Sequence, residues 1–154
     1  MDIDEAYLKV REHVGRTYRE ELGEIREIDI QRFAGAIGDE VVAAMDPHVA
    51  PPLYLSAVSG WDWGPPQSEL RVDGTWAEQL AGVPTQGLRL MGGGQSLEFF
   101  EPVVAGTPMV EQTRVMDVRL KSGKTGKLLL IDVERIFISG GRPVVRCVER
   151  YIGR

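Results

Sequence analysis

Two aspartates and a histidine lie close together between positions 39 and 48, and side chains of these types can transfer protons. Asp39, Asp46 and His48 precede the stretch APPLYLSAVSGWD, in which two prolines lead into an apolar run. A neutral imidazole beside a carboxylate is a common pair for general acid–base chemistry on a bound substrate. Asp-Pro-His is equally typical of an ordinary turn before a helix. The residue types alone leave both interpretations of His48 open.

Two helices are predicted ahead of this segment. Apolar residues recur at helical spacing over residues 3–14, which predicts an amphipathic helix that ends at Gly15. After a short extended piece, GEIREIDI, Asp29 is the expected N-cap of a second helix that ends at Gly38.

A third helix is predicted directly after the prolines at 51 and 52, which suit the first turn of a helix. Residues 53–61 carry almost no charge, and a helix that is apolar all round is expected to be buried on all sides. From residue 61 to residue 90 the chain is rich in Gly and Pro, which indicates a long irregular connection.

The second half of the chain predicts long antiparallel strands. The runs QSLEFFEPV, TPMVEQTRVMDVRLK, KLLLIDVERIFI and RPVVRCVERYIG are separated by the turn signals VAGT, SGKTG and SGG. Cross-strand salt links are expected among the charged residues Glu134, Arg135, Arg146, Glu149 and Arg150. Because the apolar face of such a sheet must be covered, we expect the 53–61 helix to lie across it with the strands curled around it. The predicted architecture is a single α+β hot-dog domain over residues 1–154, with residues 1–22 as an N-terminal helical extension.

Composition excludes several classes of protein. The net charge is −5 and no basic tract is present, which argues against a nucleic-acid partner or an anionic membrane surface. The N-terminus has no signal-peptide pattern and no apolar segment reaches membrane-spanning length. A single cysteine, Cys147, allows no internal disulfide and suits a reducing, cytoplasmic setting. With one Cys and two His, no metal site is expected.

The order of these pieces resembles the MaoC-like, FAS1-like dehydratase hot-dog family, in the N-terminal type found in hydroxyacyl-ACP dehydratase and enoyl-CoA hydratase subunits. The likeness rests on EIDIQRFAGAIGD, APPLYLSAVSGWD and GGGQSLEFFEPVVAG. It implies (R)-specific addition or removal of water at the 2,3 position of an acyl thioester carried on CoA or acyl carrier protein, with no other cofactor. It also implies that backbone N–H groups at the start of the buried helix polarise the thioester carbonyl.

The sequence departs from the family at the catalytic pair. Catalytic members carry Asp-x-Asn-Pro-x-His after a Gly-Asp; here Asp39 matches the aspartate, but Ala44 stands where the histidine is expected and His48 comes nine residues after Asp39. Two hypotheses remain: a rearranged dyad that uses His48 with Asp39 or Asp46, or a lost dyad in a substrate-holding subunit. The residues expected to bind substrate are Pro52, Leu53, Tyr54, Trp61 and Gly94.

The favoured prediction is a degenerate, substrate-binding subunit of a heteromeric enoyl-thioester hydratase or hydroxyacyl-thioester dehydratase. Its substrate would be a long-chain or sterol side-chain acyl-CoA or acyl-ACP. We expect a homodimer, or a heterodimer or heterotetramer with a catalytic hot-dog subunit, joined edge strand to edge strand because pairing covers a bare sheet edge. A hot-dog thioesterase and a non-catalytic acyl-CoA-binding or scaffold domain are the alternatives, and assays of hydration, thioester cleavage and binding would separate them.

Overall fold

The computed structural model describes most of the chain, and its helices and strands follow the order helix, strand, helix, short helix, then four strands. The described residues are 2–38, 46–58, 66–70, 74, 80, 82–85, 87–123 and 126–154, with the backbone alone at 57 and 58. The elements are α1 (Ile3–Arg11), β1 (Thr17–Glu24), α2 (Glu27–Ile37), α4 (Tyr54–Val58), the 3₁₀ turn η1 (Gln67–Glu69), β2 (Leu90–Phe99), β3 (Pro108–Gly123), β4 (Gly126–Ser139) and β5 (Arg142–Gly153).

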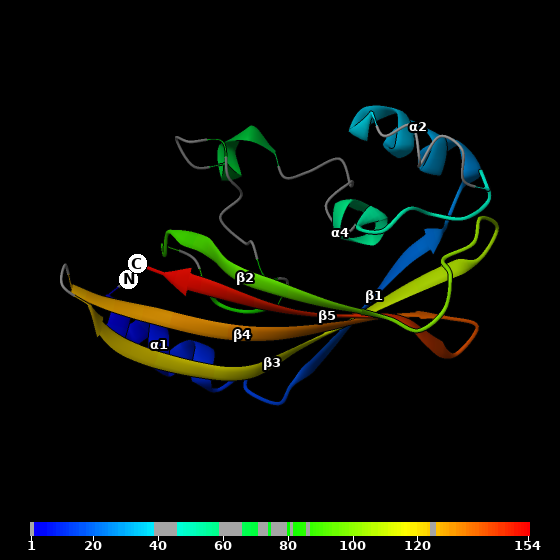
Figure 1. Cartoon of the computed structure of the whole chain (residues 1–154). Helices are drawn as coiled ribbons and strands as arrows, with labels where there is room; N and C mark the ends of the chain where they lie inside the picture. The colour runs from blue at the N-terminus through cyan, green and yellow to red at the C-terminus, as the bar shows by residue number, and fades with distance from the viewer. Residues whose placement is uncertain are drawn as a thin grey trace.

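The strands form one antiparallel sheet in the order β1-β3-β4-β5-β2, with β1 and β2 as its edges (Figure 1). β3, β4 and β5 follow one another as hairpins, as the turn signals predict. In Figure 1, α2 and α4 lie at one end of the sheet, while α1 lies at the other end against β3 and β4. The predicted α+β hot-dog fold is therefore confirmed.

The first edge strand differs from the prediction. The expected helical extension over residues 1–22 is helical only over Ile3–Arg11, and the chain enters the sheet as β1 at Thr17. The sequence of β1, TYREELGE, has little strand propensity of its own. Its conformation comes from backbone pairing with β3, for example Glu20 opposite Glu111.

The start of α2 also differs from the prediction. Arg26, not Asp29, occupies the N-cap position, and its backbone is extended at φ −96°. Asp29 lies in the first turn, where its Oδ2 accepts a hydrogen bond of 2.6 Å from Arg26 Nε. A carboxylate is favourable there because it faces the positive end of the helix dipole. The predicted end is confirmed, since Gly38 adopts the left-handed conformation at φ 64°.

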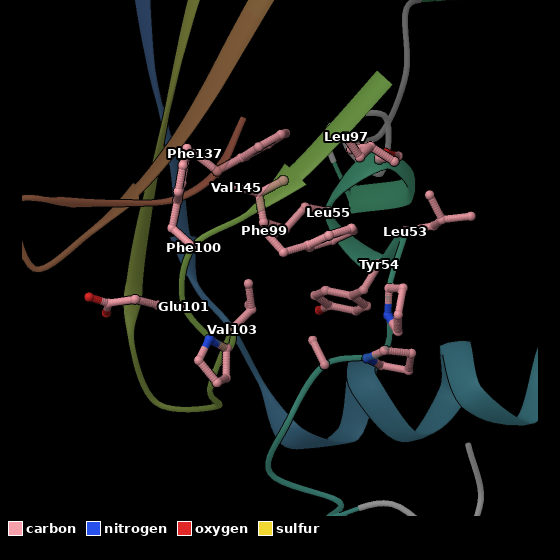
Figure 2. A pocket seen from close by; sticks show the side chains of 15 residues that line it. Leu53, Tyr54, Leu55, Leu97, Phe99, Phe100, Glu101, Val103, Phe137 and Val145 are labelled. Carbon is pink, nitrogen blue, oxygen red and sulfur yellow. The ribbon is translucent and has the colours of Figure 1, made fainter. Parts of the chain in front are cut away.

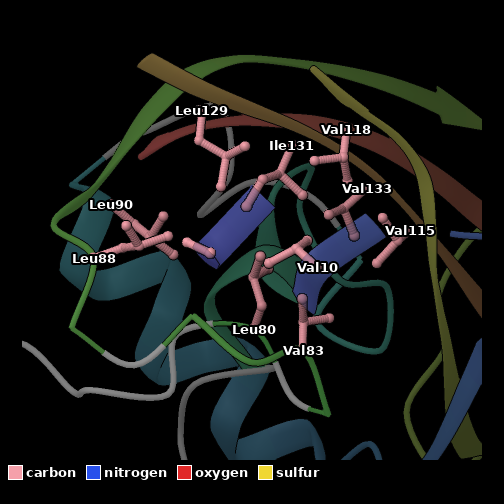
Figure 3. Close-up of a cluster of buried hydrophobic side chains, with 11 residues drawn as sticks. Val10, Leu80, Val83, Leu88, Leu90, Val115, Val118, Leu129, Ile131 and Val133 are labelled. Atoms are coloured by element: carbon pink, nitrogen blue, oxygen red, sulfur yellow. The ribbon is translucent and has the colours of Figure 1, made fainter. Parts of the chain in front are cut away.

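The core consists of two apolar clusters on one face of the sheet, which we call the inner face. Alternate residues of a strand share a face, so Leu129, Ile131 and Val133 of β4 lie on the same side as Phe137. The first cluster packs α1 and the 80–90 segment against β3 and β4 (Figure 3) and contains Ala6, Val10, Leu80, Val83, Leu88, Leu90, Val115, Val118, Leu129, Ile131 and Val133. The second lies under α2 and α4 and contains Ile25, Ile30, Tyr54, Leu55, Val103, Met109, Phe137, Val144, Val145 and Cys147.

Among the described residues, none of the helices combines the length and the apolar character that crossing a membrane requires.

Candidate functional site

An apolar cavity of about 340 Å³ opens beside the turn that leads into α4. Figure 2 shows side chains from α4, from β2 and the residues after it, and from β4 and β5 gathered around this space. Its lining consists of Ala50, Pro51, Pro52, Leu53, Tyr54, Leu55, Ser56, Leu97, Phe99, Phe100, Glu101, Pro102, Val103, Phe137 and Val145. A concave, mostly apolar cavity of this size is typical of a small-molecule site.

The start of α4 forms one wall of the cavity and is held by packing from α2. Tyr54 is buried, and its ring meets the ring of Phe33 edge-on with 5.6 Å between centroids. The Tyr54 N–H donates to the Pro51 carbonyl at 3.2 Å. Burial raises the pKa of the Tyr54 hydroxyl, which therefore stays neutral at physiological pH. The predicted 53–61 helix is described only as α4, Tyr54–Val58, and it is not buried on all sides: Tyr54 and Leu55 are buried, whereas Leu53 and Ser56 are exposed.

The mouth of the cavity is apolar and holds a strained residue. Leu53 has φ 70°, the one positive φ outside glycine among the described residues. That conformation costs an L-residue about 1–2 kcal/mol. The side chains of Leu53, Phe99 and Phe100 are about half exposed at this rim. Strain retained beside an apolar opening is typical of a functional site, because surrounding structure must hold it in place.

His48 does not line this cavity. Its side chain is 61% exposed, and Nδ1 lies 3.2 Å from Glu27 Oε2 of α2. Its backbone N–H donates to Asp46 Oδ1 at 2.9 Å, which is the turn geometry that Asp-Pro-His favours. Its carbonyl accepts from the Ala105 N–H at 2.8 Å. His48 therefore contacts both α2, through Glu27, and the loop after β2, through the Ala105 N–H.

The other predicted site residues separate into three groups. Pro52, Leu53 and Tyr54, which the sequence predicts to bind substrate, lie in the lining of the cavity. Gly94 lies on the edge strand β2, opposite Arg150, at φ 136° beside a bulge and away from the cavity lining. Asp39 and Trp61 lie outside the described residues.

A buried polar cluster on the inner face was not predicted as a site. Arg135 of β4 lies between two carboxylates: its Nη1 is 3.2 Å from Glu111 Oε1 of β3, and its Nε is 3.0 Å from Glu149 Oε2 of β5. Tyr151 donates from its hydroxyl to Glu149 Oε2 at 2.9 Å, and Thr113 donates to Glu111 Oε1 at 2.7 Å. The Arg135 and Glu111 side chains are only 17% and 5% exposed. The sequence signal was the alternation of β5, which places Glu149 on the buried side with Val145 and Cys147.

This cluster lines a second, smaller cavity of about 130 Å³. Its walls are Ser56, Arg135, Phe137, Cys147, Glu149 and Tyr151. Burial raises the pKa of the Cys147 thiol, which keeps it protonated and a poor nucleophile. Burial also raises the pKa of Tyr151, to about 12.

Over the described part of the chain, no three His, Cys, Asp or Glu side chains gather in a way that could hold a metal ion. The expected cross-strand salt links are confirmed: Arg146 Nε lies 2.8 Å from Glu134 Oε1, and Arg135 pairs with Glu149 as described above.

Comparison with known proteins identifies the family. The profile of the FAS1-like, dehydratase domain region matches residues 12–147, which is most of the chain. The chain therefore belongs to the FAS1-like dehydratase domain family, and its fold is the MaoC-like hot-dog fold. Among the curated proteins, no relative matches.

Solved structures of the same fold are similar at low identity. The ChsH1-ChsH2 complex from Mycobacterium tuberculosis matches with a TM-score of 0.62 and 15% identity, covering 98% of this chain and 90% of the other. The (3R)-hydroxyacyl-ACP dehydratase HadBC complex from the same organism matches with a TM-score of 0.62, 16% identity and coverage of 92% and 97%. R-hydratase PhaJ1 from Pseudomonas aeruginosa matches with a TM-score of 0.60, 19% identity and coverage of 91% and 81%.

Proposed function

We propose that this chain is the substrate-binding subunit of a heteromeric, (R)-specific enoyl-thioester hydratase or 3-hydroxyacyl-thioester dehydratase. The observation that carries the proposal is the apolar cavity beside α4, because it offers an acyl group an enclosed apolar wall at Tyr54, Leu55 and Phe137. Burying an acyl chain there is favourable by about 0.8 kcal/mol for each methylene removed from water.

The chemistry of the cavity wall supports a binding role over a self-sufficient active site. None of the described lining residues is a histidine, and Glu101 is the one carboxylate among them. Figure 2 shows the Glu101 carboxylate directed away from the other lining side chains, and Arg142 lies 3.2 Å from it. His48 is exposed outside this lining, and its Nδ1 lies 3.2 Å from Glu27 Oε2. The proton-transfer pair is therefore expected to come from a partner subunit.

Two of the similar structures support the heteromeric assembly, since ChsH1-ChsH2 and HadBC are complexes of two chains. The edge strand β2 gives this chain a surface for pairing with another hot-dog chain, because no strand among the described residues pairs with its outer backbone groups. A long or bulky acyl group, as in a long-chain or sterol side-chain thioester, is the substrate class that the apolar mouth favours.

The first test is activity of the purified chain alone and mixed with a hot-dog protein that carries an intact Asp-x-Asn-Pro-x-His. We expect no hydration of crotonyl-CoA or longer enoyl-CoAs by this chain alone, and turnover in the mixture that His48→Ala leaves unchanged. Turnover by the chain alone that is lost in Asp39→Ala and His48→Ala would instead support the rearranged dyad. Thioester cleavage without hydration would support a thioesterase, and binding without chemistry in any mixture would support a scaffold.

A cavity-filling variant tests whether acyl groups bind beside α4. Ala50→Phe places a ring at the lining of the cavity, and we expect at least a tenfold loss of affinity for dodecanoyl-CoA, measured by calorimetry. Met116→Phe, on a half-exposed residue of β3 outside that lining, is the matched control and should bind normally. Equal affinity of the two variants would place the acyl group elsewhere.

A further inference from the structure

The two cavities on the inner face are adjacent. Ser56 of α4 and Phe137 of β4 belong to the walls of both. The larger cavity is apolar and opens at Leu53 and Phe99, whereas the smaller one is bounded by Arg135 and Glu149. A ligand that enters past Leu53 and fills the apolar cavity would therefore have its far end at a polar wall.

The polar wall has hydrogen-bonding capacity that the described residues do not use. A carboxylate offers about four acceptor positions. Glu149 accepts from Gln95 Nε2 at 3.0 Å and from Tyr151, and lies near Arg135 Nε, which leaves it at least one free position. The N–H of Arg135 Nε is buried and not aligned on any acceptor, although Glu149 Oε2 is only 3.0 Å away. The wall thus offers both an acceptor and a donor.

The charge of the wall limits what can bind there. Arg135 lies against two carboxylates, those of Glu111 and Glu149, so the cluster carries a net negative charge. Glu111 Oε2 is also buried without a hydrogen-bond donor among the described residues. A second anion would meet like charge in a poorly solvated place, which is costly. A methyl group would leave the buried polar atoms unpaired, whereas a neutral group that both donates and accepts would satisfy them.

We infer that the two cavities form one acyl site, and that its polar end binds a hydroxyl group carried on the acyl chain beyond its apolar part. The inference rests on the proposed function and specifies its substrate class: a thioester whose acyl chain bears a distal hydroxyl. The hydroxyl donates to Glu149 and accepts from Arg135, while the methylenes occupy the apolar cavity.

Matched ligands test the inference in the full-length chain, or in its complex with the catalytic subunit. Calorimetry would compare acyl-CoAs from octanoyl to tetradecanoyl with their ω-hydroxy and ω-carboxy counterparts. We expect the best ω-hydroxyacyl-CoA to bind about tenfold more tightly than the unsubstituted ligand of equal length, because hydrogen bonds to charged groups contribute about 1.5–3 kcal/mol. The ω-carboxy ligand should bind most weakly of the three.

Equal or tighter binding of the unsubstituted ligands at every length would overturn the inference and leave the proposed function standing. Binding of none of the thioesters would overturn both. Tightest binding of the ω-carboxy ligand would show that Arg135 dominates the wall, which also contradicts the inference.

A variant pair separates recognition from a purely structural role. Glu149→Gln keeps the size of the side chain but weakens the acceptor, so the ratio of ω-hydroxy to unsubstituted affinity should fall at least threefold. Damage to the fold alone would lower both affinities and leave the ratio unchanged. Glu98→Gln, on an exposed carboxylate of β2, is the control and should keep the full ratio.

Discussion

The two faces of β4 and β5 both carry arginine–carboxylate pairs. On the outer face the carboxylates of Asp132 and Glu134 are largely buried, but their arginines are exposed to solvent and each carboxylate has two arginine partners. Asp132 accepts from Arg150 through both of its oxygens, at 2.6 and 2.7 Å, and from Arg119 at 2.8 Å. Glu134 similarly accepts from Arg114 and Arg146, each at 2.8 Å. The arginines there are roughly half exposed, so water can solvate the guanidinium N–H groups that do not donate to a carboxylate.

On the inner face one arginine serves two carboxylates. Arg135 is largely buried between Glu111 and Glu149, and two of the polar atoms in this group lack an aligned partner among the described residues. Exposed ion pairs contribute little to stability, whereas an incomplete buried group is costly and persists where something else requires it. This difference motivates the proposal that the inner cluster is a binding wall, whereas the outer pairs need no role beyond structure.

The largest expected effect comes from removing the central cation of the inner face. Arg135→Met leaves Glu111 and Glu149 buried without a positive charge and should lower the free energy of unfolding by about 3–5 kcal/mol. Arg150→Met, the matched change on the outer face, should cost about 1 kcal/mol or less, because Asp132 keeps Arg119 as a partner at 2.8 Å and Arg150 itself is partly exposed. Urea unfolding at neutral pH measures both, and similar losses would remove the distinction between the faces.

A smaller effect on the free energy of unfolding is expected at alkaline pH, where Tyr151 titrates. Burial raises its pKa to about 12, against about 10 in an unfolded chain. The folded state holds this proton more tightly, so its contribution, about 3 kcal/mol, is complete below about pH 10 and lost as pH rises through about 12. Unfolding free energy measured over that range should therefore fall less steeply in Tyr151→Phe than in the wild type. Tyr7→Phe on α1 is the control, and a slope like that of Tyr151→Phe would contradict the assignment.

The smallest expected effect on the free energy of unfolding is at acidic pH and comes from Asp132 on the outer face. Hydrogen bonding from Arg150 and the charges of Arg150 and Arg119 hold the pKa of Asp132 below its usual value. Its stabilisation is thus present above about pH 4 and lost as pH falls through the lower folded pKa. Asp132→Asn should cost about 1 kcal/mol at neutral pH and flatten the acid limb of the stability curve. Asp117→Asn, on a more exposed carboxylate of the same face, is the control; if it flattens the curve as much, the Arg150 pair is not the cause.

The strands of the second half were predictable because their signals are local. Turn residues separate long runs of β-branched and apolar residues, and the alternation of Val145 and Cys147 with Arg146 assigns each residue of β5 to a face. The apolar stretch after Pro51 likewise predicted the buried residues Tyr54 and Leu55. β1 was missed because its strand conformation depends on pairing with a segment about ninety residues further along the chain.

The lining of the candidate site was foreseen from the sequence only in part, for a similar reason. Pro52, Leu53 and Tyr54 were expected at the substrate site and do line the cavity. The direction of His48, however, is decided by its contact with Glu27 on a different element. The sequence did not predict that Glu111, Arg135 and Glu149 form one polar wall, because these residues come from three different strands.

The amino-acid sequence by itself determined the long strands of the second half, the buried residues after Pro51 and the family, because alternation, turn residues and the proline-led apolar run are properties of neighbouring residues. Only the tertiary structure decided which charged residues meet. The registers of β3, β4 and β5 bring Glu111, Arg135 and Glu149 onto one buried face. In that poorly solvated place, each unpaired polar atom has a large energetic effect.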